Sequence, residues 1–261
     1  MIPKVVHYCW LSGDPYPEKI RRCMDSWKRL LPDYEFVLWN RERFPRGKST
    51  WVDQAFDARK YAFAADYIRL YALYNFGGIY LDADVEVVRP FDDLLELPYF
   101  FGREMEDSPI EAATMGCEKG NPLIKDVLDT YVGKSFVRPD GSFDDLPLPN
   151  LFKPLLKERY ALKSISSIAE FDPDPKVVNV FPLAWFSPKE HGSGRVSLSP
   201  ETYSIHQFYA SWFDRKARFF LWMSRSVHPR VWSWVAFFLR KSSAIARSAL
   251  AVARRRGRGD A

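Results

Sequence analysis

The order of apolar and polar positions at the start of the chain predicts a β-α-β unit. Residues 2–10, IPKVVHYCW, form an apolar run that is typical of a buried strand, and a turn follows at residues 11–15. Behind Pro17, apolar side chains recur with helical spacing, which predicts a helix as far as Leu31. The run YEFVLW at residues 34–39 predicts the second strand. This order is typical of the start of a nucleotide-binding sheet.

A second unit brings two carboxylates to the end of a strand. Residues 57–76 are rich in Ala, Tyr and Leu and predict a long helix, and the Gly-Gly pair that follows ends it because glycine tolerates left-handed backbone geometry. A short strand is expected at residues 79–81, with Asp82 and Asp84 directly behind it. Ligands bind at the carboxyl ends of strands in open α/β sheets. We therefore expect both carboxylates at a site-forming edge.

Weaker patterns in the rest of the chain complete an α/β domain. They predict a helix at residues 122–131 and a loop rich in Pro and Asp at residues 138–149. Short strands are expected at residues 100–102, 177–181 and 203–208. The expected organisation is one catalytic domain at residues 1–212, with a nucleotide-binding half (1–98) and an acceptor-side half (99–212), followed by a separate extension (213–261).

Composition excludes several classes of protein. At 261 residues with 47% hydrophobic content, the chain is long enough to bury a substantial core. The three cysteines, Cys9, Cys23 and Cys117, lack metal-binding spacing and are odd in number, so we expect neither a disulfide framework nor a zinc site, and a reducing compartment fits best. No signal peptide and no apolar run of the ~18 residues that a membrane span requires is visible, so an integral membrane protein is not expected.

The net charge of +5 is concentrated at the end of the chain. Residues 213–261 hold twelve Lys and Arg against two Asp, together with several Trp and Phe, and the remainder is mildly acidic. This asymmetry argues against a general nucleic-acid binder. It predicts a helical extension that lies on an anionic membrane surface, at the cytoplasmic face. The alternative is a helical hairpin packed on the domain.

The motif Asp82-Ala83-Asp84 suits a divalent cation. Mg²⁺ and Mn²⁺ prefer oxygen ligands, and a diphosphate leaving group needs its charge neutralised, so one cation that joins carboxylates to phosphates meets both requirements. The motif alone is weak, because such a pair is often only solvated. On the preceding helix, Asp66 and Arg69 share one face and are placed to reach a ribose hydroxyl and a phosphate. The alternative for these two residues is a surface ion pair.

Three blocks carry a resemblance to a known family. They are KYAFAADYIRLYALYNFGGIYLDADVEVVRP at residues 60–90, IPKVVHYCW at the start, and SIHQFYASW at residues 204–212. In this order they resemble glycosyltransferase family 32, whose sugar-binding region contains an Asp-x-Asp motif and which includes initiating α-1,6-mannosyltransferases and bacterial capsule enzymes. The resemblance implies a GT-A type fold, with a mixed central sheet, that binds a nucleotide sugar.

The resemblance also implies roles for individual residues. Asp82, Asp84 and Arg69 would be the catalytic group, and Asp84, Asp82 and His206 would hold Mn²⁺ or Mg²⁺. For the UDP- or GDP-sugar, Trp10 would stack on the base, and Asp66 and Arg69 would contact the ribose and the sugar or phosphate. Tyr80 and Asp82 would hold the ribose and the hydrated metal. Ser211 and Trp212 would contact the phosphates.

The expected reaction is a metal-assisted hexosyl transfer with retention of configuration, from a nucleotide sugar, with UDP-hexose favoured over GDP-mannose. The acceptor would be a hydroxyl of a glycan or a lipid-linked saccharide in surface polysaccharide or oligosaccharide synthesis. Glu104, Glu106 and Glu111 either contact the acceptor or lie on the surface, and the surface is favoured. Two alternatives stay open: a haloacid-dehalogenase-type phosphatase, in which the first Asp is a nucleophile, and a sugar- or nucleotide-binding protein without turnover.

Overall fold

The computed structural model describes residues 1–103, 110–190 and 193–209. Residues 1–189 and 197–207 form one compact unit, to which all the helices and strands of the described residues belong. The predicted phosphate contacts at Ser211 and Trp212, and the extension at 213–261, lie outside the described residues.

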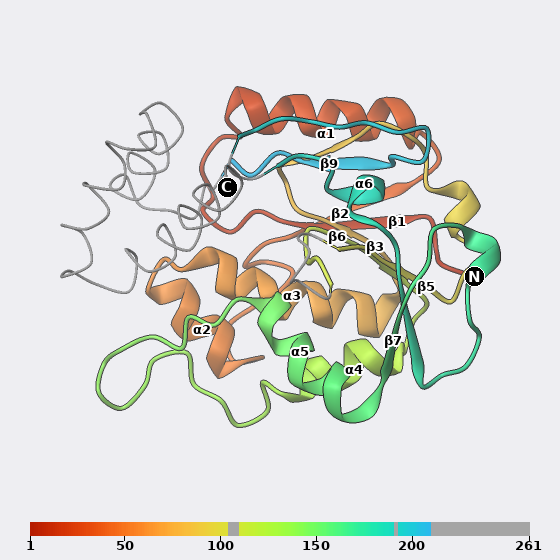
Figure 1. Ribbon diagram of the computed structural model, residues 1–261. Coiled ribbons are helices and arrows are strands. Elements are labelled where there is room, and N and C mark those ends of the chain that lie inside the picture. Colours follow the sequence, from red (N-terminus) through yellow and green to blue (C-terminus); the bar gives the residue numbers. More distant parts are fainter. Residues whose placement is uncertain (104–109, 191–192, 210–261) are drawn as a thin grey trace, which may run out of the picture. The chain divides into compact units, whose positions relative to one another are not determined.

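A mixed five-stranded sheet forms the centre of this unit (Figure 1). The strand order is β2-β1-β3-β6-β5, and the strands are β1 (Val5–Cys9), β2 (Glu35–Trp39), β3 (Gly78–Leu81), β5 (Tyr99–Phe101) and β6 (Thr114–Cys117). β2, β1 and β3 are parallel, whereas β6 runs antiparallel to both β3 and β5. The predicted α/β class with a mixed central sheet is confirmed.

The strand order reverses between β1 and β3. The chain leaves β1 toward β2 on one side and later returns to form β3 on the other side of β1. Connections therefore diverge at the carboxyl ends of β1 and β3, which is where open α/β sheets bind ligands. Trp10 follows β1 and Asp82 follows β3, so two of the predicted site residues leave the sheet at this point.

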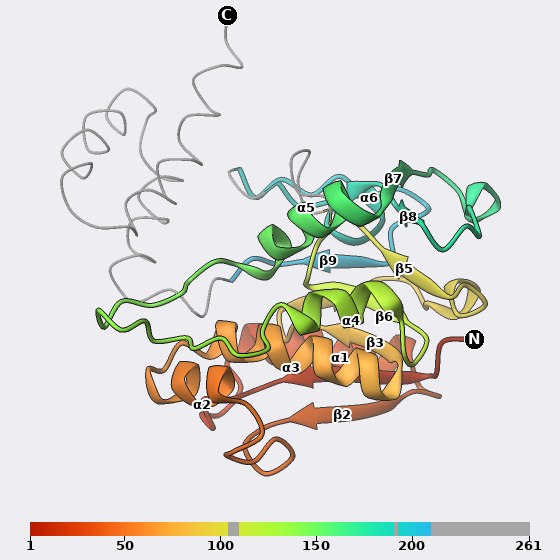
Figure 2. The same cartoon turned by 90° about the horizontal axis from the view of Figure 1, so that it is seen from below.

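Helices cover the two faces of the sheet. Figure 1 shows α1 (Glu18–Leu30) on one side, and Figures 1 and 2 show α3 (Tyr61–Phe76) and α4 (Pro122–Asp129) on the other, with α2 (Thr50–Asp57) and α5 (Leu148–Arg159) nearby. α3 is apolar around most of its circumference because it packs against β1 and β3 on one side and against α2 and α4 on others. In the part of the chain that the structure describes, no helix has the length and apolarity to cross a membrane.

Shorter elements extend the unit beside the site. β4 (Val85–Val87) pairs antiparallel with β9 (Ser204–His206), and β7 (Ala161–Ser164) pairs parallel with β8 (Val177–Val180). The short helix α6 (Leu183–Phe186) precedes β9, and 3-10 turns lie at Asp92–Leu94 and Ile168–Glu170. The β4–β9 pair brings the late part of the chain next to the Asp-x-Asp motif.

The predicted order of the first five elements is confirmed, although α2 and β4 in this part of the chain were not predicted. The helix predicted at residues 57–76 is wrong at its start, because α2 ends at Asp57 and α3 begins at Tyr61. β6 was not predicted, since its four residues, TMGC, include a glycine that disfavours a strand. The structure requires that glycine: a Cβ on Gly116 would lie 2.1 Å from the ring of Phe100 on the neighbouring strand.

His7 is held in one neutral form within the sheet. It is 2% exposed, its Nε2 lies 2.9 Å from the carbonyl oxygen of Gly77, and Trp39 Nε1 donates to its Nδ1 at 3.2 Å. A carbonyl only accepts and an indole N–H only donates, so Nε2 carries the proton and Nδ1 does not. Burial lowers the pKa of His7, and protonation of Nδ1 would place two donors against each other.

Replacing His7 with Gln is expected to remove part of the acid sensitivity of folding. Because the folded state holds His7 neutral, the unfolded chain binds the extra proton once the pH falls below its unfolded pKa, and the free energy of unfolding then decreases with falling pH. This contribution has a slope of at most about 1.4 kcal/mol per pH unit. Urea unfolding of both proteins between about pH 7.5 and about pH 5.5 measures it. Equal pH dependence of the two proteins would contradict this account.

Candidate functional site

The backbone behind β3 forms a tight turn that presents two carboxylates. The amide of Asp82 donates to the carbonyl oxygen of Ala113 at 2.8 Å, and the amide of Val85 donates back to the carbonyl oxygen of Asp82 at 2.9 Å. The carbonyl oxygen of Asp84 accepts from the amide of Gln207 at 3.0 Å. Backbone hydrogen bonds to Ala113 and Gln207 therefore hold the turn in place independently of its side chains.

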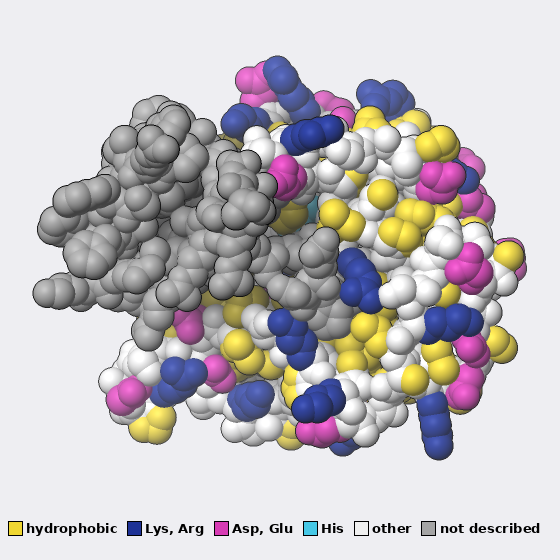
Figure 3. Space-filling view, viewed as in Figure 1, with side chains coloured by type: hydrophobic (Ala, Val, Ile, Leu, Met, Phe, Trp, Pro, Cys, Tyr) yellow, Lys and Arg dark blue, Asp and Glu magenta, His cyan; other side chains and the backbone are white. Residues whose placement is uncertain are grey.

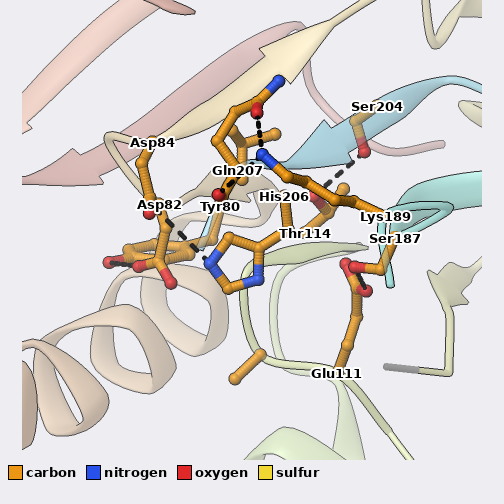
Figure 4. Close-up of polar contacts among 12 residues, drawn as sticks. Tyr80, Asp82, Asp84, Glu111, Thr114, Ser187, Lys189, Ser204, His206 and Gln207 are labelled. Atoms are coloured by element: carbon orange, nitrogen blue, oxygen red, sulfur yellow. Dashed lines mark hydrogen bonds and ion pairs between the residues drawn. The ribbon is translucent and has the colours of Figure 1, made fainter. Parts of the chain in front are cut away.

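The β4–β9 pair places an imidazole beside these carboxylates. Val85 lies opposite His206 in the register of the two strands, and His206 Nε2 lies 3.5 Å from Asp84 Oδ1. One ligand atom each from Asp82, Asp84 and His206 lies within 4.8 Å of the others, and all three residues are half-buried. Figure 4 shows the three side chains converging from two segments that are distant in the sequence.

This donor set fits a divalent cation of the Mn²⁺ or Mg²⁺ class. Two carboxylates supply hard oxygen ligands and cancel the charge of the ion, and an imidazole nitrogen suits Mn²⁺ as well. The half-buried position leaves access for further ligands such as phosphate oxygens. The structure thus brings His206 to Asp82 and Asp84, and its role as a metal ligand stays a prediction.

Arg69 is buried between two carboxylates. Its guanidinium lies 3.1 Å from Asp66 Oδ1 and 3.2 Å from Asp82 Oδ1, and it also donates to the carbonyl oxygen of Ala112. Arg69 is only 4% exposed. The alternative of a surface ion pair on this helix is therefore wrong. Because Arg69 faces Asp82 directly, it orients that carboxylate and offsets its charge in a region of low dielectric.

Burial and neighbouring charges have opposing effects on the pKa values of Asp82 and Arg69. Burial raises the pKa of Asp82, and the nearby charge of Asp84 adds to this effect, whereas Arg69 and His206 act in the opposite direction. Burial disfavours the charge on Arg69, but attraction by Asp82, Tyr80 and Asp66 outweighs it and raises the pKa of Arg69. Metal binding requires both carboxylates to be deprotonated. The positive charge of a bound cation would offset the repulsion between them.

Tyr80 supports Asp82 from within the sheet. Its hydroxyl donates to Asp82 Oδ1 at 3.1 Å, and its ring lies under the guanidinium of Arg69, 4.5 Å from centroid to Cζ. Tyr80 is 1% exposed. Tyr80 therefore orients Asp82, while the ribose contact predicted for it stays a prediction.

Two predicted donor contacts have other partners in this structure. Trp10 donates through its indole N–H to the carbonyl oxygen of Asp14 at 2.7 Å, and its ring packs 4.9 Å from that of Tyr16. Besides its pairing with Arg69, Asp66 accepts from the amide of Leu148 at 3.3 Å. The predicted base contact of Trp10 and ribose contact of Asp66 are untested.

Sequence reasoning placed Glu111 on the surface, and that placement is wrong. Glu111 is fully buried, its carboxylate accepts a hydrogen bond from the hydroxyl of Ser187 behind α6, and Thr114 and Ser204 pair nearby at 3.2 Å (Figure 4). The neighbours of Glu111 in the sequence, IEAATMGC, are mostly apolar, which was the available signal. Glu104 and Glu106 lie outside the described residues.

A hollow of about 250 Å³ lies elsewhere, at the start of α2. It is lined by residues of that start and by Tyr67 and the turn behind α4, and it includes none of the predicted site residues. The chemistry of the chain is therefore assigned from the carboxylate-imidazole cluster and not from this hollow.

An α/β domain with a mixed sheet, whose central strand ends in paired carboxylates, is the arrangement expected of GT-A type glycosyltransferases. Residues 17–101 match the family described as "Glycosyltransferase sugar-binding region containing DXD motif". The resemblance predicted from the sequence is confirmed over this region. The match includes Asp66, Arg69, Tyr80, Asp82 and Asp84, but it ends before His206.

Curated relatives and solved structures extend the comparison. Inositol phosphoceramide mannosyltransferase 3 of Schizosaccharomyces pombe is 37% identical over 131 residues, which cover 49% of this chain and 36% of that protein. The mannosyl phosphorylinositol ceramide synthase SUR1 of Saccharomyces cerevisiae is 31% identical over 130 residues, which cover 47% and 33% respectively. The chain thus spans about a third of the length of either relative. The PaToxG glycosyltransferase structure has 22% identity and a TM-score of 0.43, over 59% of this chain and 68% of that one.

Replacing Asp84 with Asn is expected to weaken Mn²⁺ binding without loss of folding. Changes in residues that only support metal ligands cost ~10- to 100-fold in affinity, so removal of a direct ligand charge should cost at least as much. Without metal, the substitution relieves repulsion between Asp84 and Asp82, so the urea midpoint should not fall. Titration of Mn²⁺ by electron paramagnetic resonance measures the affinity.

The matched control is Asp145→Asn, which removes the same charge from an exposed residue outside the carboxylate-imidazole cluster. Its Mn²⁺ affinity should equal that of the unchanged protein. An Asp84→Asn protein that binds Mn²⁺ as tightly as this control would show that Asp84 is not a ligand.

Proposed function

We propose that the protein is a metal-assisted glycosyltransferase that moves a hexosyl group from a nucleotide sugar to a hydroxyl of a glycan or lipid-linked acceptor. The observation that carries the proposal is the convergence of Asp82, Asp84 and His206 at the carboxyl end of β3, within and beside a region that matches a glycosyltransferase family. Both the ligand set and its position at a strand end suit a cation that holds a diphosphate.

The names of two relatives favour a mannosyl donor. Both are described as acting in mannosylation of inositol-containing ceramides, which suggests a GDP-sugar and a lipid acceptor for this chain too. The sequence alone favoured a UDP-hexose. The base contact assigned to Trp10 does not decide between the two donors, because an indole ring stacks on uracil or guanine alike.

The residues of the site divide the work of transfer between them. Asp82, Asp84 and His206 would hold the cation, which supplies Lewis-acid stabilisation to the departing diphosphate. Arg69 and Tyr80 keep the carboxylate of Asp82 in the orientation that this requires. In a front-face displacement, the acceptor hydroxyl attacks the anomeric carbon as the diphosphate leaves with the bonding electron pair, and the acceptor proton passes to the departing oxygen.

The family match argues against the phosphatase alternative, because residues 17–101 match a glycosyltransferase sugar-binding region. In the phosphatase, Asp82 would be the nucleophile. The contacts of Asp82 with Tyr80 and Arg69 orient its carboxylate, which also suits the role of a metal ligand.

The expected outcome of a donor screen is Mn²⁺-dependent thermal stabilisation by one class of nucleotide sugar. A ligand at about a hundred times its Kd stabilises the folded state by about 2.7 kcal/mol, which raises the apparent Tm. GDP-mannose, UDP-glucose and UDP-galactose are compared with and without Mn²⁺, and slow release of free sugar from the stabilising donor is then followed. Asp84→Asn should lose both signals and Asp145→Asn neither.

Stabilisation by a nucleotide sugar with no sugar release and no transfer would favour the binding-protein alternative. Release of inorganic phosphate from phosphomonoesters, with no response to nucleotide sugars, would favour the phosphatase.

The proposal extends to attachment of the protein at the cytoplasmic face of a membrane through residues 213–261. On the face drawn in Figure 3, basic and acidic side chains of the described residues are interspersed, whereas residues 213–261 are strongly basic. A polybasic, aromatic segment suits an anionic surface, and each basic residue there adds ~1 kcal/mol. Such attachment would bring the site to a lipid-linked acceptor.

We expect the full chain to co-sediment with liposomes that contain phosphatidylserine, and to be released as salt increases because the attraction is screened. Neutral phosphatidylcholine liposomes are the control and should retain much less protein. Equal partition with both kinds of liposome, or with neither, would contradict attachment by charge.

A further inference from the structure

The charges around the cation site leave the leaving group only partly neutralised. Asp66, Asp82 and Asp84 carry three negative charges, and Arg69 offsets one of them. A divalent cation bound through a neutral His206 would bring this cluster to zero. A departing nucleoside diphosphate gains negative charge as it leaves, and the summed charge of these four side chains and the cation is not positive. A further cation near the phosphates would therefore stabilise the transition state.

Lys189 lies beside the segment that carries His206. Its ammonium group donates to the side-chain oxygen of Gln207 at 2.6 Å and to the backbone oxygen of Gln207 at 3.1 Å. Gln207 directly follows His206, and its amide donates to the carbonyl oxygen of Asp84. Figure 4 shows the side chain of Lys189 extending over His206 toward Gln207. One residue thus links the ammonium group to two of the expected metal ligands.

The surroundings anchor the base of Lys189 but leave its end adaptable. The preceding residues from Trp185 to Pro188 are buried, and Ser187 is fixed by its hydrogen bond to Glu111. Lys189 itself is half-buried, and the flexible four-carbon stem of its side chain allows the ammonium group to move. A phosphate oxygen would add the attraction of its own negative charge to a hydrogen bond from the ammonium group, since Lys binds phosphate as a point charge.

Gln207 is itself oriented for this exchange. Its side-chain nitrogen donates to Glu86 Oε2 at 2.8 Å, so its oxygen is turned toward Lys189. When the ammonium group moves to a ligand, Gln207 keeps its place through Glu86 and Asp84. Gln207, which contacts Lys189, therefore need not move when the ligand binds.

We propose that Lys189 is a catalytic residue that contacts the terminal phosphate of the nucleoside diphosphate leaving group. This inference rests on the proposed function. As the bond between the anomeric carbon and the phosphate oxygen breaks, the electron pair stays on that oxygen, and the ammonium group donates a hydrogen bond to the phosphate without transferring its proton. Lys189 supplies the positive charge that the Asp66, Arg69, Asp82, Asp84 and cation cluster lacks.

The test compares Lys189→Met with Lys189→Arg and with Lys176→Met, a control that removes an exposed lysine from a distant loop. Isothermal titration in the presence of Mn²⁺ measures the Kd for GDP and UDP, and for GMP and UMP. Loss of a charged hydrogen bond should weaken diphosphate binding by about tenfold or more. Monophosphate binding should change little, because the terminal phosphate is absent. Lys189→Arg should restore most of the affinity, and Lys176→Met should match the unchanged protein.

A second measurement separates contact with phosphate from support of the metal ligands. The Kd for Mn²⁺ alone should be the same in Lys189→Met and the unchanged protein. If Mn²⁺ binding weakens by the same factor as diphosphate binding, Lys189 only positions His206 and Asp84, and the proposal is wrong. Lys189→Gln, which keeps a polar end, replaces Lys189→Met if the latter has a lowered urea midpoint.

Two further outcomes are distinct. If the unchanged protein binds GDP or UDP with Mn²⁺ and Lys189→Met binds them equally well, the role of Lys189 is refuted while the proposed function stands. If the unchanged protein binds neither diphosphate, the proposed function fails and this inference fails with it.

Discussion

The buried contact between Arg69 and the carboxylates of Asp66 and Asp82 is the interaction on which the site depends. A guanidinium that is 4% exposed is tolerated only where its charge is offset, and here Asp66 on α3 and Asp82 in the turn behind β3 do so, while the carbonyl oxygen of Ala112 accepts one of its hydrogen bonds. The same contact joins the helix to the strand end. It thereby fixes Asp82 at the carboxyl edge of the sheet before any ligand is present.

The second constraint is the pairing of β4 with β9. Three residues of β9 return to the strand that directly follows Asp84, and this return places His206, Gln207 and Lys189 around the carboxylates. The central sheet thus supplies the acidic side of the site, and the late segments supply its nitrogen-containing groups. A cation held between the two sides would join them, and in the proposed reaction the leaving phosphate would contact both.

How far the sequence predicted this arrangement differs from element to element. Spacing alone predicted β1, α1, β2 and the end of α3, because long periodic runs and a Gly-Gly stop are local signals. β6 and α5 were not predicted, because Gly116 interrupts the apolar residues of β6 and Pro154 lies inside α5. Among site residues, the sequence pointed to Asp82, Asp84 and His206 and missed Glu111, whose burial depends on Ser187 from another segment.

By itself, the sequence determined the class of the domain and the chemistry of its acidic motif. Apolar periodicity, glycine stops and the order of three blocks are all properties of residues close together in the chain. Tertiary structure alone decided that Arg69 is buried against Asp82, that Glu111 lies inside, and that Lys189 reaches the segment of His206. The physical reason is that the energies of buried charges depend on their partners in space, and those partners are brought together only when β9 pairs with β4.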